Sequence, residues 1–193
     1  TIFHNQTDTN QQDIILAKTI TGFSKFIKQI SPDMIIVHGD RIEALAGAIV
    51  GSFNNILVSH IEGGEISGTV DELIRHAVTK LSHIHFAANN DAKQRLIQLG
   101  ESKNSIFVIG SPDIEVMTSV ELPTIDQVMG HYKIPFKDFA VFIFHPITTE
   151  LDALQQQISE VISSLIESNK NYIVIYPNND TGTEIILEEI KKI

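Results

Sequence analysis

The sequence contains no cysteine and no tryptophan, and it is short of basic residues. Without cysteine, disulfide bonds and thiolate chemistry are excluded, so any catalysis must rely on histidine, carboxylates, hydroxyls, lysine or arginine. The 14 Lys and Arg residues stand against 24 Asp and Glu residues, which gives a formal net charge of −10. That balance gives no support to binding of a nucleic-acid backbone, which requires a basic surface. A local basic pocket for one phosphorylated ligand is still compatible with it.

Long hydrophobic runs and an apolar leader are absent as well. No stretch approaches 18 consecutive apolar residues, so no membrane-spanning helix is predicted. Residues 1–12 are polar and lack the charged-then-apolar layout of a secretory signal. A hydrophobic content of 42% fits a folded chain and not a disordered one. We therefore predict a soluble, cytoplasmic protein that does not associate with membranes.

Short apolar runs alternate with longer amphipathic segments in the first part of the chain. The predicted strands are 34–37, 56–58, 84–88 and 106–109, and the predicted helices are 14–30, 41–52, 70–81 and 91–99. The continuous apolar run at 34–37 is typical of a strand buried on both faces. Gly100 occupies the position favoured just after a helix C-cap. Strand–helix alternation with short connections predicts an α/β fold, with a parallel sheet and helices on both faces.

The alternation breaks at residues 119–138, where Pro123 and Pro135 interrupt it. We place an interdomain linker there, between an N-terminal Rossmann-like domain over 1–118 and the start of a C-terminal Rossmann-like domain over 139–193. The second domain has predicted strands at 139–144 and 172–176, a helix at 151–168 and a helix from about Thr183. One such unit cannot complete a doubly wound domain, and the first domain opens without a first strand. Both domains are therefore predicted to be incomplete in this chain.

Polar residues directly follow the predicted strands, at the edge where open parallel sheets bind ligands. Asp40 and Glu62 follow the first two strands, and two carboxylates in one site can divide the roles of acid and base. Asp40 has a second interpretation as a helix N-cap, for which Asp is favoured. Gly63 and Gly64 leave Glu62 no helix to cap. Paired glycines either let the backbone approach a ligand closely or form an ordinary loop.

Other polar residues carry weaker signals. Asp71 and Arg75 are four residues apart on a predicted helix, so they fit either an exposed ion pair or an Arg75 that orients a carboxylate beside a phosphate. His83 and His85 share one face of a strand, but no third ligand is evident, so no metal site is predicted. His145 ends a strand of the second domain, where it either contacts a ligand or bonds to local backbone. The sequence has no Walker A, G-x-G-x-x-G or G-x-S-x-G motif.

The order of motifs resembles that of the hydrolysing UDP-N-acetylglucosamine 2-epimerases over almost the whole chain. The motifs are His38 to Arg41, His60 to Asp71, Ile74 to His76, Lys80 to His85, Ile109 to Asp113, Phe144 to Thr149 and Tyr176 to Gly182. The run H-I-E-G-G-E-x-S-G-T-x-D is the most specific of them. Non-hydrolysing epimerases differ in the segment after the H-x-E element, which favours the hydrolysing branch.

That resemblance implies the glycosyltransferase-B architecture of two Rossmann-like domains, with the active site in the cleft between them. It implies conversion of UDP-N-acetylglucosamine and water into N-acetylmannosamine and UDP, the first step of sialic acid biosynthesis. The implied route removes the proton at C2, expels UDP to give a 2-acetamidoglucal, and adds water. No cofactor is implied. The expected partners are the nucleotide sugar, UDP and further copies of the same chain, as a homodimer or a higher homo-oligomer.

The same resemblance, carried over motif by motif, assigns roles to individual residues. Catalytic roles are expected of Asp40, Glu62, Asp71, Arg75 and His145. Contacts to the substrate or UDP are expected of Arg41, Gly63, Gly64, Ser67, Gly110, Ser111 and Pro112, and supporting roles of His38, His60, His83 and His85. Because the C2 proton is only weakly acidic, we expect the base to be a desolvated carboxylate with a raised pKa.

Three alternatives stay open at this point. The same reaction could act on a UDP-linked 2,4-diacetamido sugar of the legionaminic acid pathway. A glycosyltransferase of the same architecture is a second alternative, although it has no use for three acids around C2. The third is a non-catalytic UDP-sugar-binding fragment. The family's N-terminal strand, its Gly/Arg loop and its later UDP-gripping loop have no counterpart here, so 193 residues by themselves are predicted to give little or no turnover.

Overall fold

A computed structural model describes residues 11–147, 150–178 and 180–192 of the chain. The chain forms two compact units, Thr1–Val120 and Glu121–Ile193. Inside the stretch that we interpreted as a linker lies an eight-residue helix, α6 (Ile125–Tyr132), which falls in the second unit. Each unit has its own sheet and its own hydrophobic core.

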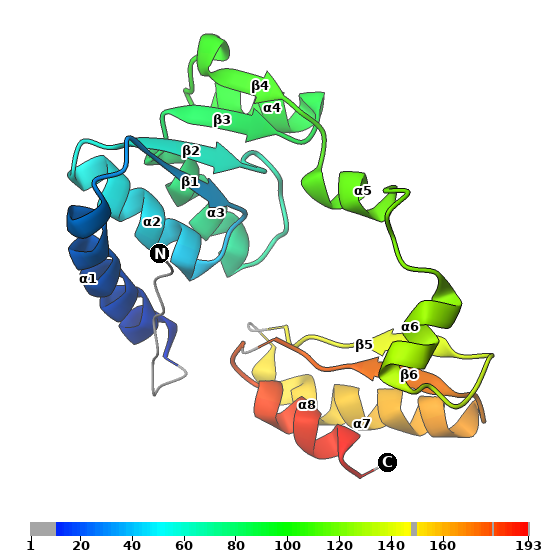
Figure 1. The fold of residues 1–193 in the computed structure, drawn as a ribbon. Coiled ribbons are helices and arrows are strands. Elements are labelled where there is room, and N and C mark those ends of the chain that lie inside the picture. The colour runs from blue at the N-terminus through cyan, green and yellow to red at the C-terminus, as the bar shows by residue number, and fades with distance from the viewer. Residues whose placement is uncertain (1–10, 148–149, 179, 193) are drawn as a thin grey trace. The chain divides into compact units, whose positions relative to one another are not determined.

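The first unit contains four parallel strands and the helices that connect them (Figure 1). Its elements are α1 (Gln12–Ile30), β1 (Met34–His38), α2 (Ile42–Phe53), β2 (Leu57–Ile61), α3 (Val70–Lys80), β3 (Ile84–Ala87), α4 (Asn90–Gln98), a 3-10 turn (Lys103–Ser105), β4 (Ile106–Val108) and α5 (Pro112–Met117). The predicted strands and helices are confirmed, and α5 is an addition to them. Gly100 follows the C-cap of α4 with a φ of +91°, as its position in the sequence predicts.

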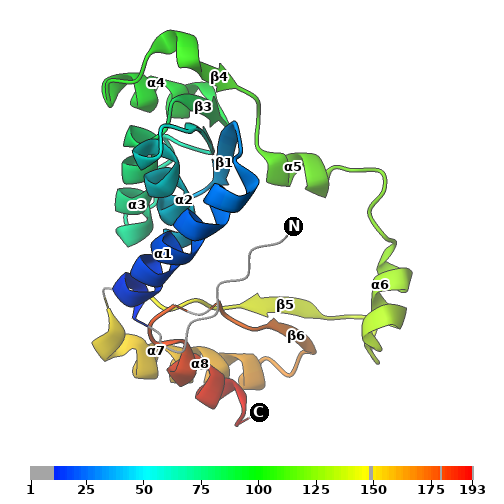
Figure 2. The same cartoon turned by 60° about the vertical axis from the view of Figure 1, so that its left-hand side comes forward.

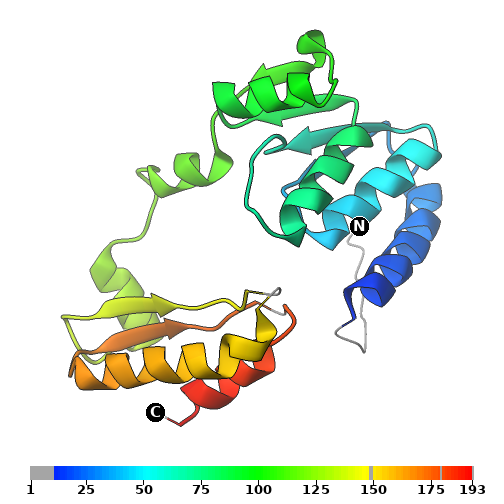
Figure 3. The same cartoon turned by 180° about the vertical axis from the view of Figure 1, so that it is seen from behind.

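The strands of this unit are paired in the order β1-β2-β3-β4. Successive right-handed crossovers in one direction place the connecting helices on the same face, and Figure 3 shows α2, α3 and α4 together on one face of the sheet. Along β1, Ile35 and Val37 are buried, whereas Met34 and Ile36 are 38% and 62% exposed. The predictions of helices on both faces of the sheet and of a strand at 34–37 buried on both faces are therefore wrong for the described chain, since the connecting helices cover one face only.

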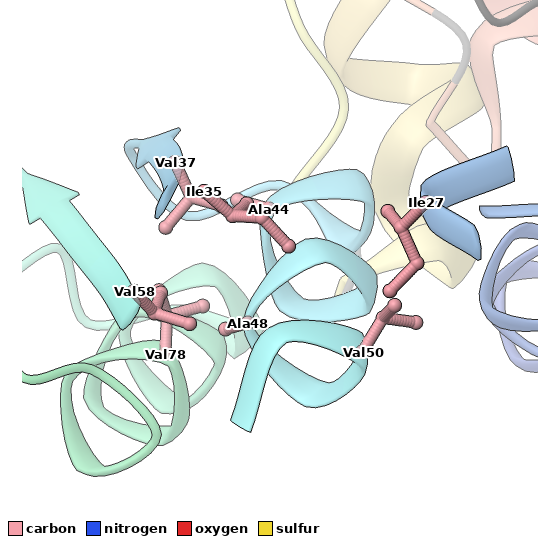
Figure 4. Packing of buried hydrophobic residues seen from close by; sticks show 8 residues of the cluster. All are labelled: Ile27, Ile35, Val37, Ala44, Ala48, Val50, Val58 and Val78. Atoms are coloured by element: carbon pink, nitrogen blue, oxygen red, sulfur yellow. The ribbon is translucent and has the colours of Figure 1, made fainter. Parts of the chain in front are cut away.

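The core of the first unit lies between the sheet and this helical layer, and it continues between α2 and α1, where Ile27 faces Val50 (Figure 4). Its buried side chains come from α1, β1, α2, β2 and α3: Ile27, Ile35, Val37, Ala44, Ala48, Val50, Val58 and Val78. The small residues of α2 let it lie close to the strands, since a Cβ at Gly51 would come within 3.0 Å of the Val58 side chain. Helix α1 packs along α2 (Figure 2). A second cluster, which includes Ala87 and Leu96, joins α4 to β3 and β4.

The second unit is a smaller strand–helix–strand–helix arrangement. After α6 come β5 (Ala140–Ile143), α7 (Leu151–Glu167), β6 (Tyr172–Ile175) and α8 (Thr183–Ile190). The two strands are parallel, and α7 and α8 lie on the same face of them (Figure 3). Their core consists of Phe142, Leu154, Ile158, Ile162, Ile186 and Ile190. Within the described ranges of both units, no helix is long and apolar enough to cross a membrane.

Candidate active site

Glu62 lies where the ends of three strands of the first sheet meet. It follows β2 directly, and its carboxylate is bonded on both oxygens. His38, the last residue of β1, places its Nε2 2.9 Å from Oε2 of Glu62. Ser111, which follows β4, donates its hydroxyl to Oε1 at 2.8 Å. The topology of the sheet therefore brings together three residues that are up to 73 positions apart in the motifs quoted above.

The backbone of Glu62 has a φ of +64°, a left-handed conformation that is uncommon for a residue with a side chain. Such a conformation costs about 1–3 kcal/mol and persists where the surroundings enforce it. The N–H of Glu62 donates to the carbonyl of Phe86 in β3 at 2.8 Å, which extends the pairing of β2 with β3 by one residue. The strained backbone of the turn after β2, held by its bond to β3, thus fixes the position of Glu62.

The pKa of Glu62 is set by opposing effects. Partial burial raises it, but the hydrogen bonds from His38 and Ser111, with the nearby charges of His38 and Arg75, outweigh burial and lower the pKa of Glu62 below its ordinary value. The expectation of a raised pKa is therefore wrong for this carboxyl. An ionised carboxylate only accepts hydrogen bonds, so the proton of the His38–Glu62 bond belongs to Nε2 of His38.

Asp40 and Arg75 form an ion pair across the same edge of the sheet. The side chains are 21% and 13% exposed, respectively, and Arg75 comes from α3. The N-cap interpretation of Asp40 is wrong, because the N-cap of α2 is Arg41 and it makes no side-chain cap bond. Arg75 pairs with Asp40 and not with Asp71, whose carboxylate accepts a bond from the Thr69 hydroxyl at 3.3 Å. The Nε of Arg75 is buried and has no hydrogen-bond partner.

His60 connects three parts of the site: β2, to which it belongs, the loop at Gly39, and α3. It is fully buried, with Nε2 2.9 Å from the carbonyl of Gly39 and Nδ1 3.2 Å from the hydroxyl of Thr79. Because a carbonyl only accepts, Nε2 carries the proton and Nδ1 accepts from Thr79. Desolvation by burial lowers the pKa of His60 to about 4, although the bond to Gly39 opposes it. A neutral His60 therefore ties the loop before Asp40 to α3. Sequence reasoning missed Thr79, which has no distinguishing neighbour pattern.

Gly63 and Gly64 are explained by the protein's own packing. A Cβ at Gly63 would stand 2.9 Å from Nδ1 of His60 and 3.1 Å from the Thr79 hydroxyl. Gly64 has a φ of +83°, and a Cβ there would come within 3.0 Å of the backbone of Ala92 in α4. The two glycines therefore allow the turn after β2 to pack against His60, Thr79 and helix α4. A direct contact with a ligand at these two positions stays a prediction.

The loop between Gly64 and α3 is anchored at both ends. Glu65 accepts a bond from the Asn89 side chain at 2.8 Å. The N–H groups of Ser67 and Gly68 each donate to Oε2 of Glu72 at 2.8 Å, and these two bonds lower the pKa of Glu72. The hydroxyl of Ser67 lies on the surface, 3.3 Å from that of Thr69. Ser67 is thus held beside the site by its backbone, with its side chain exposed.

His83 and His85 lie apart from Asp40 and Glu62. His83 precedes β3 and accepts a bond on Nδ1 from the N–H of Val58 at 3.1 Å. His85 is fully buried with its Nε2 3.2 Å from Glu101, and burial lowers the pKa of His85 against the opposing charge of Glu101. Both contacts lie toward the amino-terminal edge of the sheet, away from Glu62. Among the described residues, no group of three or more His, Asp or Glu side chains is arranged to hold a metal.

The remaining candidate residues have defined places. Arg41 is 42% exposed, with Nε 3.9 Å from Glu43, and it lines a pocket beside β1 together with His38. Gly110 has a φ of +85° and Pro112 opens α5. His145 is exposed at the end of β5 in the second unit, where it lines a separate pocket. Thr148, Thr149 and Asn179 of the quoted motifs lie outside the described residues.

The comparisons with known proteins identify the family of the chain. The family model described as UDP-N-acetylglucosamine 2-epimerase matches residues 2–193. A Neisseria meningitidis protein named UDP-N-acetylglucosamine 2-epimerase is 49% identical over 99% of the chain, and a Legionella pneumophila protein named UDP-N,N'-diacetylbacillosamine 2-epimerase (hydrolyzing) is 39% identical over 95%. The chain covers 51% and 50% of these relatives, so it spans about half their length.

The solved structures agree on the fold. The crystal structure of UDP-GlcNAc 2-epimerase from Neisseria meningitidis, bound to UDP-GlcNAc, matches with a TM-score of 0.76 at 19% identity, over 96% of this chain and 54% of that one. The fold is thus α/β with Rossmann-like parallel sheets, of the glycosyltransferase-B type. The chain belongs to the UDP-N-acetylglucosamine 2-epimerase family.

Proposed function

We propose that the protein is a hydrolysing epimerase, which converts UDP-N-acetylglucosamine and water into N-acetylmannosamine and UDP at the entry to sialic acid biosynthesis. The observation that carries the proposal is the convergence of Asp40, Glu62 and Arg75 at the carboxyl edge of the first sheet. The name of the Neisseria relative supports the substrate, and the name of the Legionella relative supports the hydrolysing reaction.

The reaction requires a proton to move and a charged group to leave. The C2–H bond breaks to a base while the bond from C1 to the UDP oxygen breaks, which leaves a double bond between C1 and C2. Water then adds its oxygen to C1, and C2 regains a proton on the opposite face. Glu62 is ionised and has lone pairs beyond the two that His38 and Ser111 occupy, so it is competent to accept a proton.

The other site residues fit the same reaction. Asp71 lies in the first turn of α3, the helix that also presents Arg75. The positive charges of Arg75 and Arg41 stabilise the negative charge that develops on UDP as it departs. Asp40 holds Arg75 through their ion pair, and His60 holds the backbone just before Asp40. His145 is proposed to contact the diphosphate from the second unit.

Proton NMR of UDP-N-acetylglucosamine in D2O tests the proposal directly. The expected products are free UDP and N-acetylmannosamine that carries deuterium at C2. Asp40→Asn removes the carboxylate that faces Arg75, and we expect kcat to fall about 100-fold or more. Asp126→Asn, at an exposed position of α6 outside the quoted motifs, is the matched control and is expected to keep activity. Release of UDP with the C2 proton retained would contradict the elimination route, and formation of UDP-N-acetylmannosamine would contradict hydrolysis.

Because the relatives are about twice as long, the assay needs two chains. One is the chain of 193 residues, and the other is extended at both ends with the corresponding segments of the Neisseria relative. Turnover by the extended chain alone would show that the reaction requires those segments. UDP binding without consumption of sugar by either chain would favour a non-catalytic binding protein.

The identity to the Legionella relative favours one second candidate, the same reaction on a UDP-linked 2,4-diacetamido sugar. Both nucleotide sugars are compared in one competition assay followed by mass spectrometry. We expect UDP-N-acetylglucosamine to be consumed first, in line with the higher identity to the Neisseria protein. Preferential consumption of the diacetamido sugar would assign the protein to the second reaction.

A further inference from the structure

The hydroxyl of Ser111 is used in an unusual way. Ser111 is the N-cap of α5, a position where a serine oxygen normally accepts a bond from the backbone N–H of the first turn. Here the side chain makes no cap bond. It donates to Oε1 of Glu62, a residue 49 positions earlier in the chain. Helix α5 thus lacks a stabilising cap bond, because the Ser111 hydroxyl points toward the Glu62 carboxylate.

We propose that Ser111 is a positioning residue, whose hydroxyl fixes the orientation of the Glu62 carboxylate from the end of β4 while His38 fixes the other oxygen from the end of β1. This assignment differs from the contact with UDP that the family resemblance implied for Ser111, and the experiment below separates the two roles. It rests on the proposed function, in which Glu62 takes part in proton transfer.

The backbone around Ser111 supports this role. Gly110 has a φ of +85°, which turns the chain sharply after β4, and Pro112 fixes the first residue of α5. Because a proline disfavours the helical backbone region for the residue before it, Pro112 keeps Ser111 extended, with a φ of −94° and a ψ of 127°. A donor held in this way fixes the direction of its bond better than a hydroxyl on a free loop.

The two bonds to Glu62 come from opposite sides of the site. His38 belongs to β1 and Ser111 follows β4, while the strained backbone of Glu62 itself follows β2. A carboxylate bonded on one oxygen rotates about its last torsion, whereas donors on both oxygens stop that rotation. The lone pairs that remain free then keep one direction. The charged groups that act on Glu62 from the neighbouring elements are His38 of β1 and Arg75 of α3.

The experiment compares Ser111→Ala with Ser111→Thr, which keeps the hydroxyl. Ser105→Ala is the control, because its hydroxyl bonds only to the local carbonyl of Ser102 on the surface. Glu62 is followed by its side-chain carboxyl carbon signal in a pH titration. Loss of the Ser111 bond is expected to move the titration midpoint of Glu62 to higher pH in Ser111→Ala, and not in Ser111→Thr or Ser105→Ala. An unchanged midpoint in Ser111→Ala would overturn the proposal.

Turnover and UDP binding provide the second measurement. We expect kcat of Ser111→Ala to fall by about 10-fold, since a bond to a charged group is lost, with KM and the Kd of UDP unchanged. A weaker Kd of UDP with kcat unchanged would assign Ser111 to UDP binding and overturn the proposal. These turnover measurements use the extended chain described above. If that chain without substitutions shows no epimerisation, the proposed function fails by itself, and the titration of Glu62 still decides the positioning by Ser111.

Discussion

Replacing Gly64 by alanine is expected to destabilise the first unit far more than the same change at Gly68. Both glycines have a positive φ, +83° and +70°, so both substitutions cost about 1–2 kcal/mol in backbone strain. At Gly64 the new methyl group would also come within 3.0 Å of the backbone of Ala92, and it would meet Leu96. Overpacking of this kind costs a further ~1–3 kcal/mol. At Gly68 nothing lies within 4 Å.

The free energy of unfolding is therefore expected to fall by roughly 2–5 kcal/mol in Gly64→Ala and by roughly 1–2 kcal/mol in Gly68→Ala. Hydrogen exchange read by mass spectrometry measures the difference, since it reports opening segment by segment. Peptides from α4 and β3 should lose protection in Gly64→Ala, and peptides from α7 in the second unit are the internal reference. Equal losses in the two variants would refute the steric explanation of Gly64.

Two further predictions concern pH and the division into units. The first unit should lose about 3 kcal/mol of stability between pH 6.5 and 4, because unfolded His60 binds its proton near 6.5 and folded His60 only near 4. Urea unfolding at pH 7.5, 5.5 and 4.5 measures this loss. His60→Gln keeps a donor for Gly39 and should reduce the loss. If the free energy of unfolding of His60→Gln depended on pH as strongly as that of the unsubstituted protein, a neutral buried His60 would be contradicted. Ile158→Ala empties a fully buried position of α7 and should cost about 2–5 kcal/mol. Exchange should then speed up in α7 and α8 and stay unchanged in α2 and β2, whereas a change in both units would show that they unfold together.

The strands and longer helices follow from hydrophobic periodicity, which depends on local sequence alone. The short helices α5 and α6 were not predicted, because they contain no buried residues. For α6 a usable signal was present, since Thr124 and Gln127 form a reciprocal capping box. The exposed face of β1 could not be predicted in the same way. A continuous apolar run does not reveal the strand order, and the strand order decides which face the helices cover.

The candidate site was predictable in outline and not in its pairing. Motif positions after the strands bring Asp40, Glu62 and Ser111 to one edge of the sheet. The partners of each side chain depend on geometry that spacing does not contain. Arg75 lies one helical turn from Asp71 and yet pairs with Asp40. The lowered pKa of Glu62 has the same origin, because its two donors, His38 and Ser111, are distant from it in the chain.

The close approach of Gly63 to His60 and Thr79 also limits how this sequence can diverge. Any side chain at position 63 would collide with the histidine ring and the threonine hydroxyl. A tolerated change at Gly63 therefore requires a smaller residue at position 60, and that change in turn removes the bond to the Gly39 carbonyl. Positions 39, 60, 63 and 79 are thus expected to evolve as one set. Chimeras that exchange α3 between relatives will retain the turn after β2 only when the residue at position 79 still fits beside the histidine.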